Sequence, residues 1–244
     1  MTRDLNPTGA PLDFRRRWPG SELMDDPACD ETMLLRTVDQ FESINRWVSR
    51  YRRILSKLVI DDLGRRSSRE HHLIDLGAGG CDIPVWLLRE ASRRGLLLRV
   101  TALDGDARIV AHARRRHPNE PGLTIHHADL ATMDQYGPVD YIFCNHVLHH
   151  LPDAVIPDVL QMMSRTASIR WLINDLVRSP WAYAGFQVFG RFYRRSFAFE
   201  DGKRSIRRGF TRQDFQQYAE IAGLRDAYDI IQIIPSRIVM HGKS

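Results

Sequence analysis

The sequence predicts an α/β fold in which the strands of a mostly parallel sheet alternate with helices. Residues 73–76 form an apolar run that is typical of a buried strand, and a glycine-rich turn and a helix pattern follow it. Residues 97–103 and 123–128 have the pattern of two further strands, and each is followed at once by an aspartate. This alternation predicts parallel βαβ units, whose ligands bind at the carboxyl ends of the strands.

The glycine-rich turn after the first strand indicates the class of ligand. Gly77, Gly79 and Gly80 let the backbone turn sharply and approach a ligand, because no Cβ stands in the way. Asp75 lies two residues before the first glycine, where its carboxylate would repel a phosphate but would suit a cationic or amine-bearing ligand. Asp82 occupies the position of the third glycine of a dinucleotide-binding loop, and no P-loop motif is present.

The segment Asp75-x-Gly77-x-Gly79-x-Cys81 resembles motif I of the class I S-adenosylmethionine-dependent methyltransferases, Asp/Glu-x-Gly-x-Gly-x-Gly. Cys81 replaces the third glycine, and we expect this departure to shift cofactor affinity. The resemblance implies that S-adenosylmethionine is the cofactor. It also implies a Rossmann-like, seven-stranded and mostly parallel sheet with the strand order 3-2-1-4-5-7-6, in which the last strand is antiparallel.

The aspartates after the next two strands agree with this resemblance. Asp104 follows the second strand at about the spacing at which nucleotide-binding folds place the carboxylate that binds ribose hydroxyls. The resemblance assigns the ribose to Asp104 and the adenine edge to Asp129 and Leu130, whereas either aspartate alone could be only a helix cap. The implied cofactor-binding residues are Asp75, Gly77, Ala78, Gly79, Asp104, Gly105, Asp129, Leu130, Asn145 and His146.

The composition favours a cytoplasmic enzyme. Among the 244 residues, no apolar run reaches the roughly 18 residues of a membrane-spanning helix, and the N-terminus lacks an apolar secretory segment. The net charge of +5 comes from arginines spread along the chain, which favours solvated helix faces over a nucleic-acid surface. The cysteines are scattered. We expect no metal site, no stable membrane insertion, no nucleic-acid partner, and a monomer or homodimer.

The chain divides into an N-terminal cap and a larger domain. We expect residues 1–66 to form an irregular N-terminus and a helical cap, with one helix opened by Asp30 and a second at residues 47–63. Residues 67–244 are expected to form the methyltransferase domain, with a substrate-pocket insertion at about residues 176–210. The remaining expected elements are strands at 139–144, 168–173, 224–234 and 237–241, a proline-interrupted helical region at 149–163, and a helix at 211–222.

The segment at residues 145–152 points to the chemistry. It resembles the Leu-His-His segment of many small-molecule methyltransferases, including ubiquinone/menaquinone-type and antibiotic-tailoring enzymes. A histidine with a pKa of about 6.5 can accept the proton of a phenol or an alcohol. The resemblance favours His149 or His150 as the general base, with Asp175, just past the fifth strand, orienting the imidazole. The alternative is that one histidine of the pair only packs at a helix start.

Aromatic residues crowd the insertion that follows the fifth strand. Aromatic pocket walls suit a flat or hydrophobic acceptor. The helical spacing of some of these residues is also that of a buried core stripe, and the arginines beside them leave open an interfacial role with a lipid-tailed substrate. The implied substrate-binding residues are Trp181, Tyr183, Phe186, Phe189 and Tyr193.

Taken with the resemblance, these motifs predict methylation of an oxygen on a small aromatic, phenolic or polyketide-derived acceptor, as in secondary metabolism. Residues 207–212 also resemble a segment of bacterial methyltransferases that accompany type III polyketide synthases. C-methylation of a quinone-type or lipid-tailed precursor shares every motif. RNA methylation is less favoured, because its amino-methylation and Pro-Cys nucleophile motifs are absent. A catalytically silent cofactor-binding protein is the alternative from another class.

Overall fold

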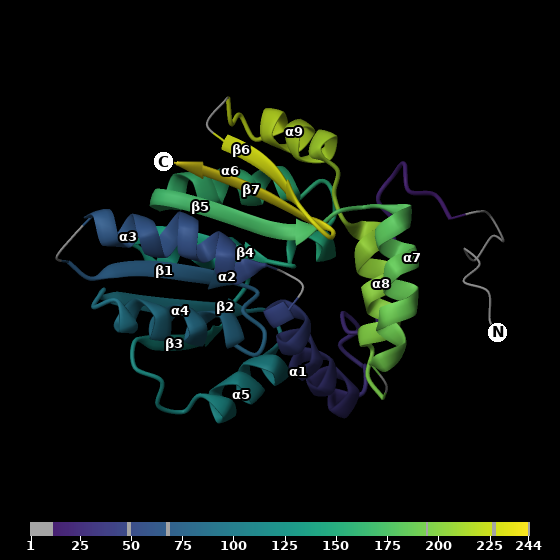
Figure 1. Ribbon diagram of the computed structural model, residues 1–244, viewed down its shortest axis with the longest axis horizontal. Helices are drawn as coiled ribbons and strands as arrows, with labels where there is room; N and C mark the ends of the chain where they lie inside the picture. Colours follow the sequence, from purple (N-terminus) through teal and green to yellow (C-terminus); the bar gives the residue numbers. More distant parts are fainter. Residues whose placement is uncertain (1–11, 48–49, 67–68, 194, 226–227, 244) are drawn as a thin grey trace.

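A seven-stranded sheet with the order β3-β2-β1-β4-β5-β7-β6 runs through the molecule (Figure 1). The computed structural model describes residues 12–47, 50–66, 69–193, 195–225 and 228–243. Five neighbouring strands are parallel, and β7 runs antiparallel to both β5 and β6. The predicted strand order and the antiparallel last strand are thereby confirmed. The strands are β1 (His71–Leu76), β2 (Leu98–Asp104), β3 (Leu123–His127), β4 (Val139–Asn145), β5 (Ala167–Leu176), β6 (Tyr228–Ile233) and β7 (Arg237–Lys243).

Helices cover both faces of the sheet and its carboxyl edge. The α-helices are α1 (Glu31–Trp47), α2 (Tyr51–Leu55), α3 (Asp61–Arg66), α4 (Asp82–Arg93), α5 (Ala107–Arg116), α6 (Ile156–Thr166), α7 (Pro180–Phe189), α8 (Ala198–Arg208) and α9 (Arg212–Ile221). A π-helix, η1 (Ser56–Ile60), joins α2 to α3, and the 3₁₀ turns are η2 (Leu130–Tyr136), η3 (Leu148–His150) and η4 (Gly190–Phe192). In the part of the chain that is described, none of the helices has both the length and the apolar character needed to cross a membrane.

The two faces of the sheet have separate apolar cores. The helices α2 to α5 pack on one face, and α6, α9 and η2 pack on the other. Successive residues of β5 show the alternation, because Trp171 and Ile173 belong to the core beneath α6 and α9, whereas Leu172 belongs to the core beneath α2 and α4. Burial on both faces is what a doubly covered parallel sheet requires. It leaves the carboxyl ends of the strands as the place where polar side chains gather.

Helix caps that the sequence indicates are present. The Asp30 carboxylate accepts a hydrogen bond from the Met33 backbone N–H at 2.7 Å, at the start of α1. Thr211 and Asp214 form a reciprocal capping box at the start of α9. Such caps satisfy backbone N–H groups that have no partner inside the helix. The helices predicted after Asp30 and Thr211 therefore begin where the sequence placed them.

Several predicted boundaries differ from the structure, and three of the differences matter here. The helix expected at 47–63 begins at Tyr51 and is divided by the π-helix η1, and Arg50 before it has a left-handed φ of 59°; residues 48 and 49 lie outside the described residues. The fifth strand continues to Leu176, so Asp175 lies inside β5, where it pairs with Ile238 of β7. The strand expected from residue 224 begins at Tyr228, and residues 226 and 227 of it are not described.

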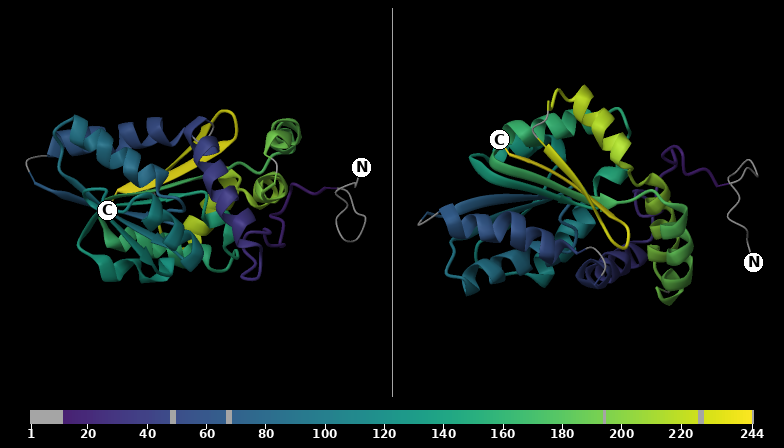
Figure 2. Two further views of the ribbon diagram at one scale, coloured as in Figure 1. Left: turned by 90° about the horizontal axis from the view of Figure 1, so that it is seen from below. Right: turned by 45° about the horizontal axis from the view of Figure 1, so that its top comes forward.

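Two helices and an irregular segment enclose the carboxyl edge of the sheet. Figures 1 and 2 show α7 and α8 side by side beyond the carboxyl end of β5, with the N-terminal segment passing next to α8. This segment, residues 12–29, contains no helix or strand. Buried side chains hold it in place. The Asp201 carboxylate of α8 accepts hydrogen bonds from the backbone N–H groups of Leu23 and Met24 at 2.6 and 3.0 Å. Arg178 donates to the Phe14 carbonyl at 2.9 Å.

Candidate active site

A cavity of about 1170 Å³ lies at the carboxyl edge of the sheet. Its walls come from the glycine turn after β1, the ends of β2 and β4, the helices α1 and α7, and the N-terminal segment. Small-molecule sites usually have volumes of roughly 300–1,000 Å³. This cavity is therefore large enough to hold a nucleoside-sized cofactor together with a second small molecule.

The glycine turn has the backbone geometry that its residues predict. Gly77 has a φ of 64°, and a Cβ added there would lie 2.3 Å from the Val147 side chain. Gly79 also has a positive φ, of 54°, but a Cβ there would meet no atom within 4 Å, because this glycine lines the open cavity. Gly77 is thus required for packing, and Gly79 leaves room for a ligand.

Asp104 anchors the turn from the end of β2. One of its carboxylate oxygens accepts a hydrogen bond from the Gly79 N–H at 2.9 Å, and the other accepts one from the Asp106 N–H at 3.0 Å. Burial raises the pKa of Asp104, although both backbone donors oppose the shift. Each oxygen keeps a lone pair that can accept a hydrogen bond from a ribose hydroxyl. The residue thus fits the role that the sequence predicts for it.

A smaller cavity of about 100 Å³ adjoins this position. Gly105, Asp129 and Leu130 line it together with Asp104. The Asp129 carboxylate accepts a hydrogen bond from the Ala131 N–H at 2.8 Å and thereby caps η2. The helix-cap interpretation of Asp129 is therefore correct, and its place beside the small cavity still agrees with the expected contact to adenine.

Two acidic residues, the buried Asp75 and the partly buried Asp82, give the cavity a character that suits a cation. Burial, together with the carboxylates of Asp82 and Asp104, holds the pKa of Asp75 well above its usual range. Burial and the nearby Glu42 raise the pKa of Asp82 to about 7. The buried Asp82 Oδ2 has no hydrogen-bond partner in the described structure. A bound ammonium or sulfonium would stabilise both carboxylates, so this chain fits S-adenosylmethionine, which carries both cationic groups.

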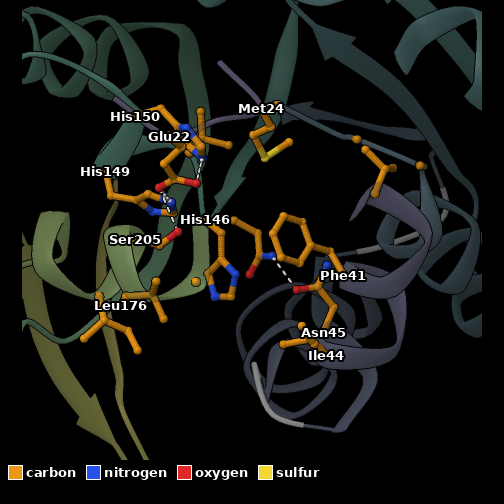
Figure 3. A pocket seen from close by; sticks show the side chains of 18 of the residues that line it. Glu22, Met24, Phe41, Ile44, Asn45, His146, His149, His150, Leu176 and Ser205 are labelled. Atoms are coloured by element: carbon orange, nitrogen blue, oxygen red, sulfur yellow. Dashed lines mark hydrogen bonds and ion pairs between the residues drawn. The ribbon is translucent and has the colours of Figure 1, made fainter. Parts of the chain in front are cut away.

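The end of β4 supplies two polar side chains. Asn145 accepts a hydrogen bond from Asn174 at 2.8 Å through its Oδ1. His146 has a left-handed φ of 58°, a strained conformation for a residue other than glycine. Burial and the nearby Arg237 hold the pKa of His146 well below its usual range, so its ring is neutral. Its Nε2 has no hydrogen-bond partner among the described residues, and the ring lines the cavity (Figure 3).

The predicted histidine pair, His149 and His150, lies beside three carboxylates. His149 Nδ1 lies 2.6 Å from Asp175 Oδ1, and His150 Nδ1 lies 2.8 Å from Asp25 Oδ1. The other ring nitrogens of both histidines point to Glu22, at 3.4 Å for His149 and 3.9 Å for His150 (Figure 3). The structure thus brings together the three residues that the sequence singled out for catalysis, and it adds Glu22 and Asp25.

The charge state of His149 opposes its predicted role as general base. Burial alone would lower the pKa of His149, but the carboxylates of Asp175 and Glu22 outweigh it and raise that pKa to about 10. The same contact, opposed by burial, lowers the pKa of Asp175 to about 2. At neutral pH His149 therefore carries both ring protons and is a poor proton acceptor. The hypothesis of a histidine base narrows to His150, which is half-buried.

The predicted aromatic wall is present with one exception. Trp181, Phe186, Phe189 and Tyr193 line the cavity. Tyr183 is not among the lining residues. It is buried in a cluster with Leu176 and Ile206. This position follows from the helix period of α7, because Tyr183 lies on the side of the helix that faces the protein.

Several lining residues were missed from the sequence. Glu22 and Asp25 come from the irregular N-terminal segment, where no periodic pattern indicates which side chains are buried. Residues of α1 also reach the cavity; the sequence predicted a helical cap here but did not indicate which of its side chains line the site. They are Val38, Phe41, Ile44 and Asn45.

Comparisons with known proteins agree with this geometry. Residues 73–168 match the family model of a methyltransferase domain. The fold is similar to that of the plantazolicin methyltransferase in complex with S-adenosylhomocysteine, with a TM-score of 0.63 at 12% identity over 86% of this chain and 90% of that chain. It is also similar to magnesium protoporphyrin IX methyltransferase from Synechocystis PCC 6803, with a TM-score of 0.53 at 12% identity over 88% and 99%.

A third similar structure is the citrinin polyketide synthase CMeT domain, with a TM-score of 0.53 at 16% identity over 75% of this chain and 49% of that chain. The sequence has no match among the curated proteins. The family match covers the glycine turn, β2 and β4, and the structural likeness extends over most of the chain. Residues 73–168 therefore match a methyltransferase domain, and the chain has the fold of class I methyltransferases, the first two of which were solved with S-adenosylhomocysteine, the product of the cofactor S-adenosylmethionine.

Proposed function

We propose that this protein methylates an oxygen of a small aromatic or polyketide-derived acceptor. The observation that carries the proposal is that one cavity joins the glycine turn and Asp104 to the aromatic residues of α7 and η4. Trp181 and Phe189, which are 85% and 70% exposed, line this cavity instead of packing in the core. Exposed rings on a cavity wall suit a flat acceptor, because they can bury it without rearrangement.

The chain's own residues position the two reactants. When bound, S-adenosylmethionine supplies a methyl group on a sulfonium sulfur. Asp104 would hold the ribose hydroxyls, and the Cβ-free surface of Gly79 would let the cofactor approach the backbone. The aromatic wall would hold the acceptor within the roughly 3–3.5 Å that in-line transfer requires. A hydroxyl acceptor must also lose its proton, and His150 on the cavity wall is suited to accept it.

C-methylation is the second candidate function. It is favoured by the structural likeness to the citrinin polyketide synthase CMeT domain, and it would use the same cavity. A carbon acceptor needs the same alignment with the methyl group, so the position of the new methyl group distinguishes the two functions.

The test is the position of the methyl group in the product. The purified protein should be incubated with S-adenosylmethionine and a panel of paired acceptors, each a hydroxylated aromatic and its O-blocked analogue. We expect methylation of the free hydroxyl compounds alone, with NMR showing the new methyl carbon bonded to oxygen. Methylation of the blocked analogues, or a new carbon–carbon bond, would establish C-methylation and contradict the proposal.

A further inference from the structure

We propose that Glu22, His149 and His150 form a binding site for a divalent transition-metal cation. One nitrogen of each imidazole and one carboxylate oxygen lie within 4.8 Å of one another. Two histidines and one carboxylate are a donor set that first-row transition metals occupy with coordination positions left open. All three residues line the large cavity, so the open positions would face a bound acceptor.

The distances are close to those of a metal site. Metal–nitrogen and metal–oxygen bonds of about 2.0–2.2 Å place neighbouring ligand atoms roughly 3.0–3.5 Å apart. Glu22 Oε1 and His149 Nε2 are already 3.4 Å apart, and Glu22 Oε2 and His150 Nε2 are 3.9 Å apart. The two rings are adjacent, with centroids separated by 4.3 Å. Binding of a metal would require His150 Nε2 to approach Glu22 Oε2 by a few tenths of an ångström.

Both histidines are oriented as metal ligands usually are. A histidine that binds a metal through one nitrogen commonly donates its other N–H to a carboxylate, which fixes the ring and its tautomer. Asp175 lies 2.6 Å from Nδ1 of His149, and Asp25 lies 2.8 Å from Nδ1 of His150. Each Nδ1 thus has its own carboxylate, and each Nε2 is turned toward Glu22 (Figure 3).

The environment of Glu22 independently indicates that a cation binds here. Glu22 is 2% exposed, and its Oε1 accepts a hydrogen bond from the Ser205 hydroxyl at 2.7 Å. Its Oε2 is buried and has no hydrogen-bond partner in the described part of the chain. A buried carboxylate oxygen without a partner is costly, and a bound cation removes the cost.

Neighbouring arginines do not fill this role. The Arg208 guanidinium donates to the carbonyl oxygens of His149 and Gly20. Arg17 donates to the same His149 carbonyl and forms an ion pair with Asp153. Neither guanidinium thus occupies the position between the two Nε2 atoms and the Glu22 carboxylate, which leaves that position to a small ion.

The cation would give the cavity a way to activate a hydroxyl. A coordinated hydroxyl oxygen has a lowered pKa and is held in a fixed position, so it ionises without a dedicated base. This role rests on the proposed function, whereas the binding of the metal does not. With the cation bound, His150 is a ligand and no longer accepts the proton, so the cation replaces His150 in the role proposed above, and Asp25 and Asp175 are positioning residues.

Co²⁺ titration tests the site without any assay of activity. The tag-free full-length protein should be dialysed against a chelator and titrated with CoCl₂ while its visible d–d absorption is recorded. We expect one Co²⁺ per chain, displacement by an equal concentration of ZnCl₂, and no displacement by an equal concentration of MgCl₂, because imidazole ligands favour transition metals. A wild-type protein without these bands, or displacement by MgCl₂, would overturn the proposal.

Matched variants locate the bound ion. Glu22→Gln and His150→Gln should each weaken Co²⁺ binding at least tenfold. His126→Gln should leave it unchanged, because His126 packs against Tyr136 away from the three ligands. Thermal melts show whether each variant folds. If Glu22→Gln does not fold, the result for His150→Gln decides the test, because His150 is only half-buried. Co²⁺ binding in His150→Gln equal to that of the wild type would refute the site, whatever acceptor the enzyme methylates.

Discussion

Cys81 stands where the methyltransferase motif has its third glycine, and it adopts the backbone conformation of a glycine. Its φ is 61°, at the N-cap of α4, and its side chain is fully buried beside Ala78, Ala102 and Ala113. A left-handed conformation costs a residue with a side chain about 1 kcal/mol or more. The departure from the motif therefore keeps the turn, and the packing of the sulfur offsets the strain.

This balance predicts an ordering of two variants. Cys81→Ala keeps the strain and loses the packing of Sγ, so its free energy of unfolding should fall by about 1 kcal/mol. Cys81→Gly loses Cβ as well as Sγ but relieves the strain of the left-handed conformation, so it should be the more stable of the two. Urea denaturation of the three proteins measures the order, and an alanine variant more stable than the glycine variant would contradict it.

Asp82 predicts a pH dependence of stability. Its pKa is about 7 in the folded protein and roughly 3.9 in an unfolded chain, so folding favours the protonated carboxyl. The stability that the protonated form provides is present at low pH and is lost as the pH rises through about 7. The neutral side chain of Asp82→Asn has no such loss.

The free energy of unfolding of Asp82→Asn, relative to that of the wild type, should therefore increase by about 1 kcal/mol or more between pH 5 and pH 8. Thermal melts in the absence of cofactor measure it, and Asp158→Asn, on the exposed start of α6, is the control. A stability difference between Asp82→Asn and the wild type that does not change with pH would show that the Asp82 carboxyl ionises normally.

At the scale of elements, one side of α7 lines the cavity and another side packs in the protein interior. Trp181 is 85% exposed and lines the cavity, whereas Tyr183 is 4% exposed and makes an edge contact with Phe14 at 5.6 Å between ring centroids. Trp181→Ala should raise the KM for the acceptor several-fold with little effect on stability. Tyr183→Ala should lower the free energy of unfolding by about 3–5 kcal/mol, as for other large buried aromatics. Kinetics and melts of both variants test this, and a Trp181→Ala variant that loses only stability would remove Trp181 from the acceptor pocket.

The elements also show what the sequence can and cannot predict. Apolar runs that end in glycine or aspartate predicted β1 and β2, because burial on both faces and a ligand at the strand ends leave that pattern, and the partly buried edge strand β3 was also predicted. The extension of β5 to include Asp175 was not predictable, because it depends on antiparallel pairing with β7. The π-helix η1 also interrupts a regular helical period that gives no warning of it.

In the candidate site, local sequence motifs predicted only the residues that lie at or directly after the ends of strands. The glycine turn and Asp104 follow strands directly, so the fold brings them together. Glu22 is different, because its position depends on Asp201 of α8 holding the backbone of Leu23 and Met24. Contacts between segments so distant in the chain have no signature in a single sequence. The carboxylate that changes the interpretation of the histidine pair was therefore found only from the structure.

At the scale of the whole molecule, the two halves of the cavity come from different parts of the chain. The strand ends and the turns that follow them line one part of the cavity, and the N-terminal segment, α1 and α7 line another. Cofactor binding should therefore depend mainly on residues at the strand ends and in the turns after them, and acceptor binding on residues of the segments that enclose the cavity. The central claim is that the glycine turn and Asp104 bind S-adenosylmethionine.

Calorimetry with S-adenosylhomocysteine tests that claim most directly. The wild type should bind one molecule per chain, and Asp104→Ala should lose about 1.5–3 kcal/mol of binding free energy, roughly tenfold to a hundredfold in affinity, because two charge-assisted hydrogen bonds are removed. Asp158→Ala is the control and should bind as the wild type does. A wild-type protein that does not bind S-adenosylhomocysteine, or a folded Asp104→Ala variant with unchanged affinity, would contradict the account.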